Sequence, residues 1–325
     1  MSALPVAPQI EVLDLRHFSS RQLRPLLERE AELWRTRLRW DYRSSTELLL
    51  QYLESRILQG FVALDRGRVC GYTFCVYEGR KAVIGDAFAA TPDYDPDPAT
   101  TRVLLTHALE MLRHSPAVDR VESQLLLFDA GEFHGLFRGT EFTIHPRLFL
   151  GLQLAKVTPQ LELAAELELR PWAPQDYQPA AELIHSCYEG HTDAQINDQY
   201  RSLHGSLRFL HNIVRFPGCG MFEPNLSWII HDRASRTLLG MVLVSRVGER
   251  VGHITQLCVA PGQRHRGMGA LLLSRCAAAM DKAGFEAVTL TVTEGNTDAV
   301  RLYQRFGFNR MHRFDAMVLD TRYKA

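Results

Sequence analysis

Apolar residues along this chain gather in short runs that are bounded by glycine, proline and charged residues. Runs of this length, rich in valine, isoleucine and aromatic residues, predict β-strands, and the weak alternation within 241–244 predicts strands buried on both faces. Longer runs with helical spacing, 101–113 and 270–280, predict helices. The mixture of strands and helices predicts an α/β (α+β) fold.

The order of these elements occurs twice in the chain. In each half we expect an entry strand with helices, a hairpin, a further strand, a helix, another strand, and a last helix and strand. The separation of Gly71 from Gly240 matches that of Gly139 from Gly307 to within a single position. An offset this constant across two anchors indicates an internal duplication.

Length and composition agree with two globular domains. The chain has 325 residues, which is more than one ordinary core accommodates. Its content of 46% hydrophobic and 23% charged residues is typical of a soluble globular protein. The pattern breaks at 156–159 and restarts at Leu167, so we expect domains of residues 1–155 and 156–325.

Charge and the lack of long apolar runs exclude several classes of protein. The 37 basic and 37 acidic residues give no net charge that would attract nucleic acid. No run approaches the ~20 apolar residues of a membrane helix, and the N-terminus has no signal core, so we expect a cytoplasmic protein with no membrane partner. The six cysteines form no C-x-x-C pair and the thirteen histidines show no ligand spacing, so we expect no metal. The sequence leaves open whether the protein is a monomer or a homodimer.

One segment of the second half carries the clearest chemical signal, and we call it the glycine-rich turn. Its residues are Arg264, His265, Arg266, Gly267, Met268, Gly269 and Ala270. It follows an apolar run that ends at Val259 and opens the helical run 271–280. Glycine lets the backbone approach an anion, first-turn amides have no intrahelical partner, and the helix dipole favours negative charge. The segment therefore predicts a phosphate-binding turn.

A second motif follows a strand-like run at 287–293. Its spaced residues are Asn296, Ala299, Leu302, Tyr303, Gly307 and Phe308. In this order, the two segments resemble the GNAT superfamily of acetyl-CoA-dependent N-acetyltransferases, which pair an R/Q-x-x-G-x-G/A turn with an N-x-x-A-x-x-L-Y-x-x-x-G-F helix. The resemblance covers residues 225–319. It implies acetyl-CoA as cofactor and two tandem GNAT-like domains, each a mixed, mostly antiparallel central sheet flanked by helices.

The resemblance also implies roles for individual residues. Tyr303 occupies the position of the general acid for the departing thiolate, and an ordinary phenol pKa of ~10 keeps its proton at neutral pH. An aromatic core residue is the alternative for this position. Backbone groups of Leu257, Cys258 and Val259 would hold the pantetheine and polarise the acetyl carbonyl. Asn296 would contact the cofactor or cap its helix.

Two residues are candidates for the base that accepts the proton of the amine. His253 precedes Gly267 by the spacing at which relatives that acetylate protein lysines carry a catalytic glutamate. An ordinary histidine pKa of ~6.5 suits that task, although a hydrogen-bonded histidine at a strand edge is the alternative. Glu294, near a strand end, is the second candidate and would act through an ordered water.

The first half differs from the second where chemistry would take place. At the position of the glycine-rich turn it has 91–99, in which three aspartates replace the arginines and prolines remove amide donors. Its last helix also lacks the tyrosine. We therefore expect a degenerate, non-catalytic first domain that serves as a scaffold, walls the acceptor pocket or binds a partner.

These features predict an N-acetyltransferase that moves an acetyl group from acetyl-CoA to a primary amine of a small molecule or peptide, by direct attack in a ternary complex. We expect residues 173–225 to select the acceptor. Thr291 stands where enzymes that acetylate ribosomal-protein N-termini have a glutamate, which disfavours that substrate class. The alternatives are a non-catalytic acetyl-CoA sensor or scaffold and an aminoacyl transferase.

Overall fold

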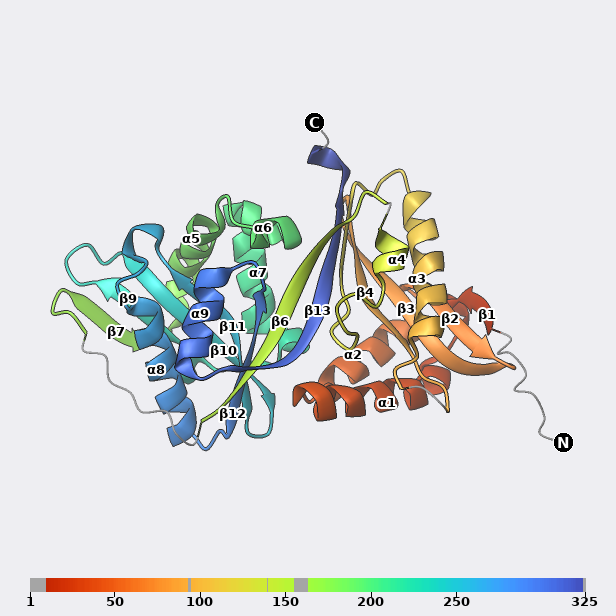
Figure 1. Ribbon diagram of the computed structural model, residues 1–325, viewed down its shortest axis with the longest axis horizontal. Coiled ribbons are helices and arrows are strands. Elements are labelled where there is room, and N and C mark those ends of the chain that lie inside the picture. The colour runs from red at the N-terminus through yellow and green to blue at the C-terminus, as the bar shows by residue number, and fades with distance from the viewer. Residues whose placement is uncertain (1–9, 93–94, 139, 155–162, 324–325) are drawn as a thin grey trace. The chain divides into compact units, whose positions relative to one another are not determined.

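The computed structural model describes residues 10–92, 95–138, 140–154 and 163–323 (Figure 1). The chain divides into two compact units, neither of which is a continuous segment. Unit 1 is Met1–Arg35, Tyr42–Pro146 and Phe314–Ala325, and unit 2 is Thr36–Asp41 and Arg147–Arg313.

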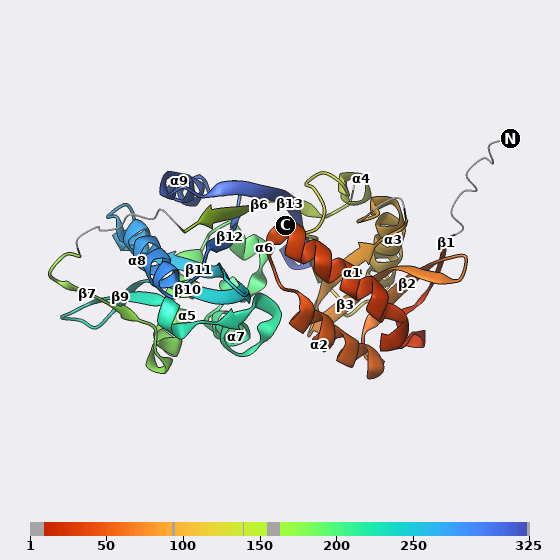
Figure 2. The same cartoon turned by 90° about the horizontal axis from the view of Figure 1, so that it is seen from below.

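Unit 1 is built on a sheet with the strand order β1-β2-β3-β4-β5-β13. Its elements are β1 (Ile10–Asp14), α1 (Ser20–Leu38), α2 (Arg43–Glu54), β2 (Gln59–Asp65), β3 (Arg68–Glu78), β4 (Lys81–Ala89), α3 (Pro98–Arg113), β5 (Arg120–Gln124), α4 (His134–Phe137) and the second part of β13 (Asn309–Asp320). Figure 2 shows α1 and α2 on one side of this sheet and α3 and α4 on the other.

Unit 2 is built on a sheet with the strand order β6-β12-β11-β10-β9-β7, and the short strand β8 also pairs with β10. Its elements are β6 (Thr143–Gln153), β7 (Leu167–Pro171), α5 (Tyr177–Tyr188), α6 (Asp193–Ile196), α7 (Leu203–Arg215), β8 (Met221–Phe222), β9 (Trp228–Asp232), β10 (Leu238–Gly248), β11 (Val251–Val259), α8 (Met268–Lys282), β12 (Ala287–Thr293) and α9 (Thr297–Phe306). Helices α8 and α9 lie on one face and α5 and α7 on the other (Figure 2).

Both sheets are mostly antiparallel and each contains one parallel pair. The parallel pairs are β4 with β5 in unit 1 and β11 with β12 in unit 2. This arrangement confirms the predicted fold class, in which each domain has a mixed, mostly antiparallel sheet flanked by helices.

The strand irregularities repeat between the two units. The ladder of β3 and β4 shifts register between Phe74 and Cys75, and the ladder of β10 and β11 shifts between Leu243 and Val244. The separation of Phe74 from Leu243 equals that of Gly71 from Gly240. Because the bulges keep the offset of the sequence repeat, they support the internal duplication. Gly139, the other anchor of the repeat in the first half, lies outside the described residues.

The last strand of each half pairs in the other unit. β6 ends the first half of the sequence, yet from Arg147 to Gln153 it pairs with β12 in unit 2. β13 ends the second half, yet from Ala316 to Asp320 it pairs with β5 in unit 1. The units therefore do not divide the chain at one point, as the expected domains 1–155 and 156–325 assume. That boundary itself falls outside the described residues.

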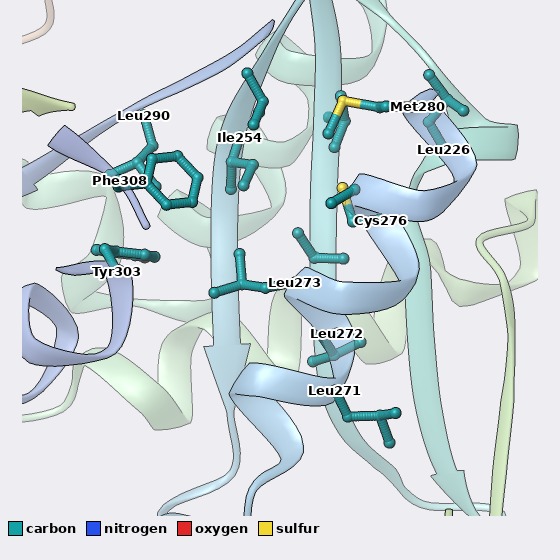
Figure 3. Close-up of a cluster of buried hydrophobic side chains, with 14 of the residues drawn as sticks. Leu226, Ile254, Leu271, Leu272, Leu273, Cys276, Met280, Leu290, Tyr303 and Phe308 are labelled. Atoms are coloured by element: carbon teal, nitrogen blue, oxygen red, sulfur yellow. The ribbon is translucent and has the colours of Figure 1, made fainter. Parts of the chain in front are cut away.

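Strands β9 and β10 are buried on both faces, which explains their continuous apolar runs. On β10, Val242 and Val244 pack beneath α8, whereas Met241 and Leu243 pack beneath α5 and α7. The apolar face of α8, from Leu271 to Met280, points onto the strands in Figure 3. Burial of both faces fixes the sheet between two helical layers.

Helices α8 and α9 begin and end where the sequence pattern places caps. α8 begins after Gly267, whose φ of 82° is left-handed, and the turn at its end contains Gly284 with a φ of 81°. The side chain of Asn296 accepts the amide of Ala299 at the start of α9, and Gly307, with a φ of 103°, ends this helix. Asn296 thus acts as a helix cap.

Arg120 on β5 offers a test of how β13 is held in unit 1. Its side chain is fully buried and donates hydrogen bonds to Glu122 and to Asp320 of β13. Asp320→Ala should lower the free energy of unfolding of unit 1 by about 3 kcal/mol, because it leaves a buried guanidinium with one carboxylate fewer. Urea unfolding measures the loss. The control, Glu110→Ala on the exposed side of α3, should change stability by about 0.5 kcal/mol or less, and equal losses in the two variants would contradict the assigned role.

Candidate active site

The two parallel strands of unit 2 stop pairing before either of them ends. Pairing of β11 with β12 runs from Val251↔Ala287 to Ile254↔Leu290. Beyond that point β11 continues to Val259 and β12 to Thr293. We call these diverging segments, 255–259 and 291–293, the β11–β12 fork. The fork presents strand backbone that has a partner on only one side.

Backbone direction determines which groups of β11 face the fork. Ala260 donates its amide to Leu239 at the edge shared with β10. Amide and carbonyl groups of successive strand residues point to opposite edges, so those of Leu257 and Val259 point into the fork. The Cys258 side chain is buried among the residues beneath α5 and α7. At this position the backbone, rather than the thiol, is available to a ligand in the fork.

The glycine-rich turn presents a set of amides to solvent. His265 and Gly267 are left-handed, with φ values of 63° and 82°, and such backbone turns adjacent N–H groups toward a common point. Within the described part of the chain, the amides of 265–270 donate no hydrogen bond to a protein acceptor. No side chain caps α8, and residues 264–267 are exposed. The turn therefore has the donors of an anion-binding site.

The two arginines of the turn have different surroundings. Arg264 folds back onto the protein, where its Nη2 lies 3.0 Å from the carbonyl oxygen of Cys187 and its Nε lies 3.4 Å from that of Val259. Arg266 is exposed and donates to the amide oxygen of Gln263 at 3.1 Å. Arg264 thus fixes the path of the turn, and Arg266 adds exposed positive charge.

The remaining residues of the turn serve packing. Met268 is buried in the core beneath α8. A Cβ atom on Gly269 would lie 3.1 Å from Cδ2 of Leu302 on α9, tighter than ordinary contact, so glycine permits the close approach of α8 and α9. Ala270 is partly buried in the first turn of α8.

The equivalent helix start in unit 1 is occupied by the protein's own carboxylate. Asp97 is buried and accepts the amides of Ala99 and Thr100 at the first turn of α3, at 2.9 and 3.4 Å. It also accepts the Thr100 hydroxyl at 2.6 Å. An anion arriving there would meet a negative charge in place of free amides.

Tyr303 on α9 is buried beside the fork (Figure 3). Burial raises its pKa, and the negative charge of Asp193 adds to this effect. Its ring packs edge-on against Phe308 with centroids 5.7 Å apart. Tyr303 is therefore part of the core and also keeps a protonated hydroxyl near the fork.

His253 has surroundings that disfavour the expected role of base. It is buried, and its Nδ1 lies 2.8 Å from the hydroxyl of Thr289. The rings of Trp40 and Phe149 pack on it with centroids 4.8 and 5.8 Å away. Burial lowers the pKa of His253 to about 3, so the imidazole binds a proton weakly. The sequence pattern did not reveal this aromatic enclosure, because Trp40 and Phe149 come from distant parts of the chain.

Glu294 follows β12 and is held by an ion pair. Arg313 donates to both of its carboxylate oxygens at 2.7–3.2 Å. This hydrogen bonding lowers the pKa of Glu294, which weakens it as a base. Both residues named for the base from the sequence thus have a lowered pKa, His253 through burial and Glu294 through Arg313.

The structure adds to the site a group of residues from the end of α5 to the start of α6. Tyr188 accepts a hydrogen bond from Gln256 of β11 at 3.1 Å. His191 lies 3.3 Å from the side-chain nitrogen of Asn296, and Asp193 accepts the hydroxyl of Thr293 at the end of β12. The sequence placed these residues in the acceptor-selecting region but did not predict that they reach the fork.

Comparison with known proteins identifies the segment that contains this site. Residues 184–308 match the model of the acetyltransferase (GNAT) family. This segment is a GNAT domain. A mycothiol acetyltransferase from Beutenbergia cavernae is 33% identical over 87 residues, which is 27% of this chain and 29% of that protein. The match therefore spans less than a third of that curated relative.

Solved structures extend the GNAT fold to almost the whole chain. A GCN5-related N-acetyltransferase from Sphaerobacter thermophilus has a TM-score of 0.69 and 16% identity, over 96% of each chain. A tandem GNAT protein from the clavulanic acid biosynthesis pathway has a TM-score of 0.60 and 14% identity, over 98% of this chain and 100% of that chain. Almost the whole chain thus shares its fold with these two structures.

The described residues also bear on membrane and metal sites. None of the described helices has the length and apolar character needed to cross a membrane. The same residues contain no group of three or more histidine, cysteine, aspartate or glutamate side chains that could hold a metal ion.

The low pKa of His253 predicts a specific acid sensitivity. In the unfolded chain, His253 becomes protonated below pH ~6.5. In the folded chain it becomes protonated only near its lowered pKa. Acid therefore favours the unfolded chain, and stability that is fully present above pH ~6.5 is lost as the pH falls. The loss is about 1.4 kcal/mol per pH unit between pH 6 and 4. His253→Gln should flatten this part of the profile, measured as unfolding free energy against pH. Parallel profiles for the two proteins would rule out this linkage.

Proposed function

We propose that this protein is an acetyl-CoA-dependent N-acetyltransferase that acetylates a primary amine of a small molecule or peptide. The observation that carries the proposal is the β11–β12 fork, which lies next to a helix start with free amides. Membership of the GNAT family in 184–308 supports it. The mycothiol acetyltransferase relative, whose name describes acetyl transfer, also supports the proposal.

The residues present fit two parts of acetyl-CoA, the pyrophosphate and the pantetheine arm. The pyrophosphate is an anion, and the amides of 265–270 with Arg266 offer it hydrogen bonds and positive charge. The pantetheine arm carries amide groups of its own, and the backbone of Leu257 and the amide of Val259 offer it the pairing that a neighbouring strand would otherwise provide. The carbonyl of Val259 already accepts from Cys187 and Arg264. A ligand held at both places would run along the fork toward Tyr303.

The reaction needs a polarised carbonyl and a proton for the leaving thiolate. Backbone amides facing the fork would stabilise negative charge that develops on the acetyl oxygen. The amine nitrogen forms the new C–N bond as the C–S bond breaks, and the Tyr303 hydroxyl gives its proton to the thiolate. We infer direct attack of the amine in a ternary complex, because the Cys258 thiol is buried beneath α5 and α7 and is not available to a ligand in the fork.

We assign this chemistry to unit 2 alone. The start of α3 in unit 1 is capped by Asp97, whereas that of α8 has no side-chain cap. One acetyl-CoA should therefore bind per chain, and unit 1 acts as a non-catalytic scaffold. We also propose that the protein works in the cytoplasm.

Gly267→Glu tests the anion site. The new carboxylate would stand at the start of α8, and repulsion of a diphosphate should raise the Kd of acetyl-CoA by about 30-fold or more, since each close like-charge pair costs about 1 kcal/mol. Isothermal titration calorimetry gives both the Kd and the stoichiometry of one.

Gly284→Glu is the matched control for this variant. Gly284 has nearly the same φ, 81° against 82°, and neither glycine has an atom within 4 Å of an added Cβ. It lies at the opposite end of α8, so the same substitution should leave the Kd unchanged. Gly267→Ala carries the backbone strain without the charge and should have a small effect. Equal weakening by all three variants would refute an electrostatic anion site.

Tyr303→Phe tests the general acid. It keeps the packing on Phe308, so the Kd of acetyl-CoA should change less than twofold, while kcat falls by about 100-fold. Because the pKa of Tyr303 is raised, the wild-type hydroxyl stays protonated through pH 10 and its ionisation should cause no alkaline loss of kcat below that pH. Steady-state assays of thiol release across pH measure both effects. The exposed Tyr52→Phe serves as control, and a fully active Tyr303→Phe enzyme would exclude the assignment.

A further inference from the structure

The segment Tyr188–Asp193 lies against the fork from the side of α5 and α7, and its position has a consequence for the acceptor. Three contacts fix it there. Tyr188 is bonded to Gln256 of β11, His191 adjoins the cap of α9, and Asp193 is bonded to the end of β12. The segment therefore contacts all three elements that surround the fork.

Asp193 is the carboxylate of this segment that is bonded to the end of β12. Its side chain is only 13% exposed and accepts the hydroxyl of Thr293. After burial, its negative charge is among the causes that raise the pKa values of Tyr188, Tyr200 and Tyr303. One carboxylate thus acts electrostatically on three tyrosines, including the proposed general acid.

Tyr188, Tyr200 and His191 form a cluster of aromatic rings in this part of the chain. Tyr188 and Tyr200 stack with centroids 4.0 Å apart and 8° between their planes, and the edge of His191 meets Tyr188 at 5.4 Å. The Nδ1 atom of His191 is 3.7 Å from the Asp193 carboxylate and 3.1 Å from its amide. The positive charge of Arg147 also acts on this cluster, because it acts to lower the pKa of Tyr200, which burial raises.

We propose that the Asp193 carboxylate binds the ammonium group of the acceptor and accepts its first proton, so that the acceptor is a primary alkylammonium compound. A buried carboxylate beside aromatic rings provides both the charge and the π-faces that favour such a cation. The inference rests on the proposed function, because it places the acceptor opposite the thioester in the same fork.

The proton balance of this step is complete. The ammonium R–NH3⁺ gives one proton to the Asp193 carboxylate, and the free R–NH2 attacks the acetyl carbon. The C–N bond forms, the C–S bond breaks, and the thiolate takes the phenolic proton of Tyr303. The second proton on nitrogen restores the tyrosine, and Asp193 returns its proton to solvent. The products are R–NH–acetyl, coenzyme A thiol and one proton.

A purely structural role for Asp193 makes a different prediction. In that case the carboxylate only holds Thr293 and closes the end of β12. Two variants separate the roles. Asp193→Asn removes the charge and keeps an oxygen for the Thr293 hydroxyl. Thr293→Val removes the hydrogen bond at a buried position and keeps the charge.

The experiment compares these variants with the wild-type full-length chain. Acetyl-CoA binding is measured by calorimetry, and thiol release at saturating acetyl-CoA is measured with n-butylamine, ethanolamine, spermidine and a peptide with a free N-terminus. For the best of these acceptors, Asp193→Asn should lower kcat/KM by about 30-fold or more, the size of a lost charge-assisted hydrogen bond. Its Kd for acetyl-CoA should stay within twofold of wild type. Thr293→Val should lose less than about fivefold, and Asp193→Glu should recover part of the activity.

The remaining outcomes would contradict either the proposed function or the role of Asp193. A wild-type protein that binds no acetyl-CoA overturns the proposed function. A wild-type protein that binds acetyl-CoA but acetylates none of the four amines overturns only the present inference. The inference also fails if Asp193→Asn is as active as wild type, or if Thr293→Val reproduces its loss, because the role would then be structural.

Discussion

The site depends on one backbone constraint, which is the end of hydrogen bonding between β11 and β12 after Ile254 and Leu290. Polar groups on a strand edge inside a protein require partners. Here the partner strand diverges, and the edge of Leu257 and Val259 faces the space between the strands. A ligand with its own amides satisfies that edge as a strand would. The bulge at Leu243/Val244 and the helices on both faces keep the two strands in this divergent geometry.

The duplicated half shows that the fork alone does not make a binding site. In unit 1, β4 and β5 also pair over only a few residues, from Lys81↔Arg120 to Ile84↔Ser123, and β4 continues beyond them. The difference lies at the following helix. Asp97 supplies a negative charge to the first turn of α3, whereas Gly267 leaves the first turn of α8 open to an external anion. The residues at the helix start therefore separate a helix that is satisfied internally from one that can bind a phosphate.

The sequence predicted the fold class, the duplication and the glycine-rich turn, because each depends on local patterning or on a fixed offset. It did not predict that β6 and β13 pair in opposite units. The apolar pattern of a terminal strand marks it as a strand but does not specify which of two similar sheets it joins. The site residues divide in the same way. Tyr303 and Asn296 lie where their motif places them, but the enclosure of His253 by Trp40 and Phe149, and the contact of Asp193 with Thr293, depend on packing between distant segments.

Amide hydrogen exchange with and without acetyl-CoA tests the central claim most directly, because the account assigns the ligand to backbone amides. We predict slower exchange at Leu257, at Val259 and throughout 265–270 when acetyl-CoA is bound, with no change in the first turn of α3. Protection confined to other segments, or equal protection at the starts of α3 and α8, would contradict the account.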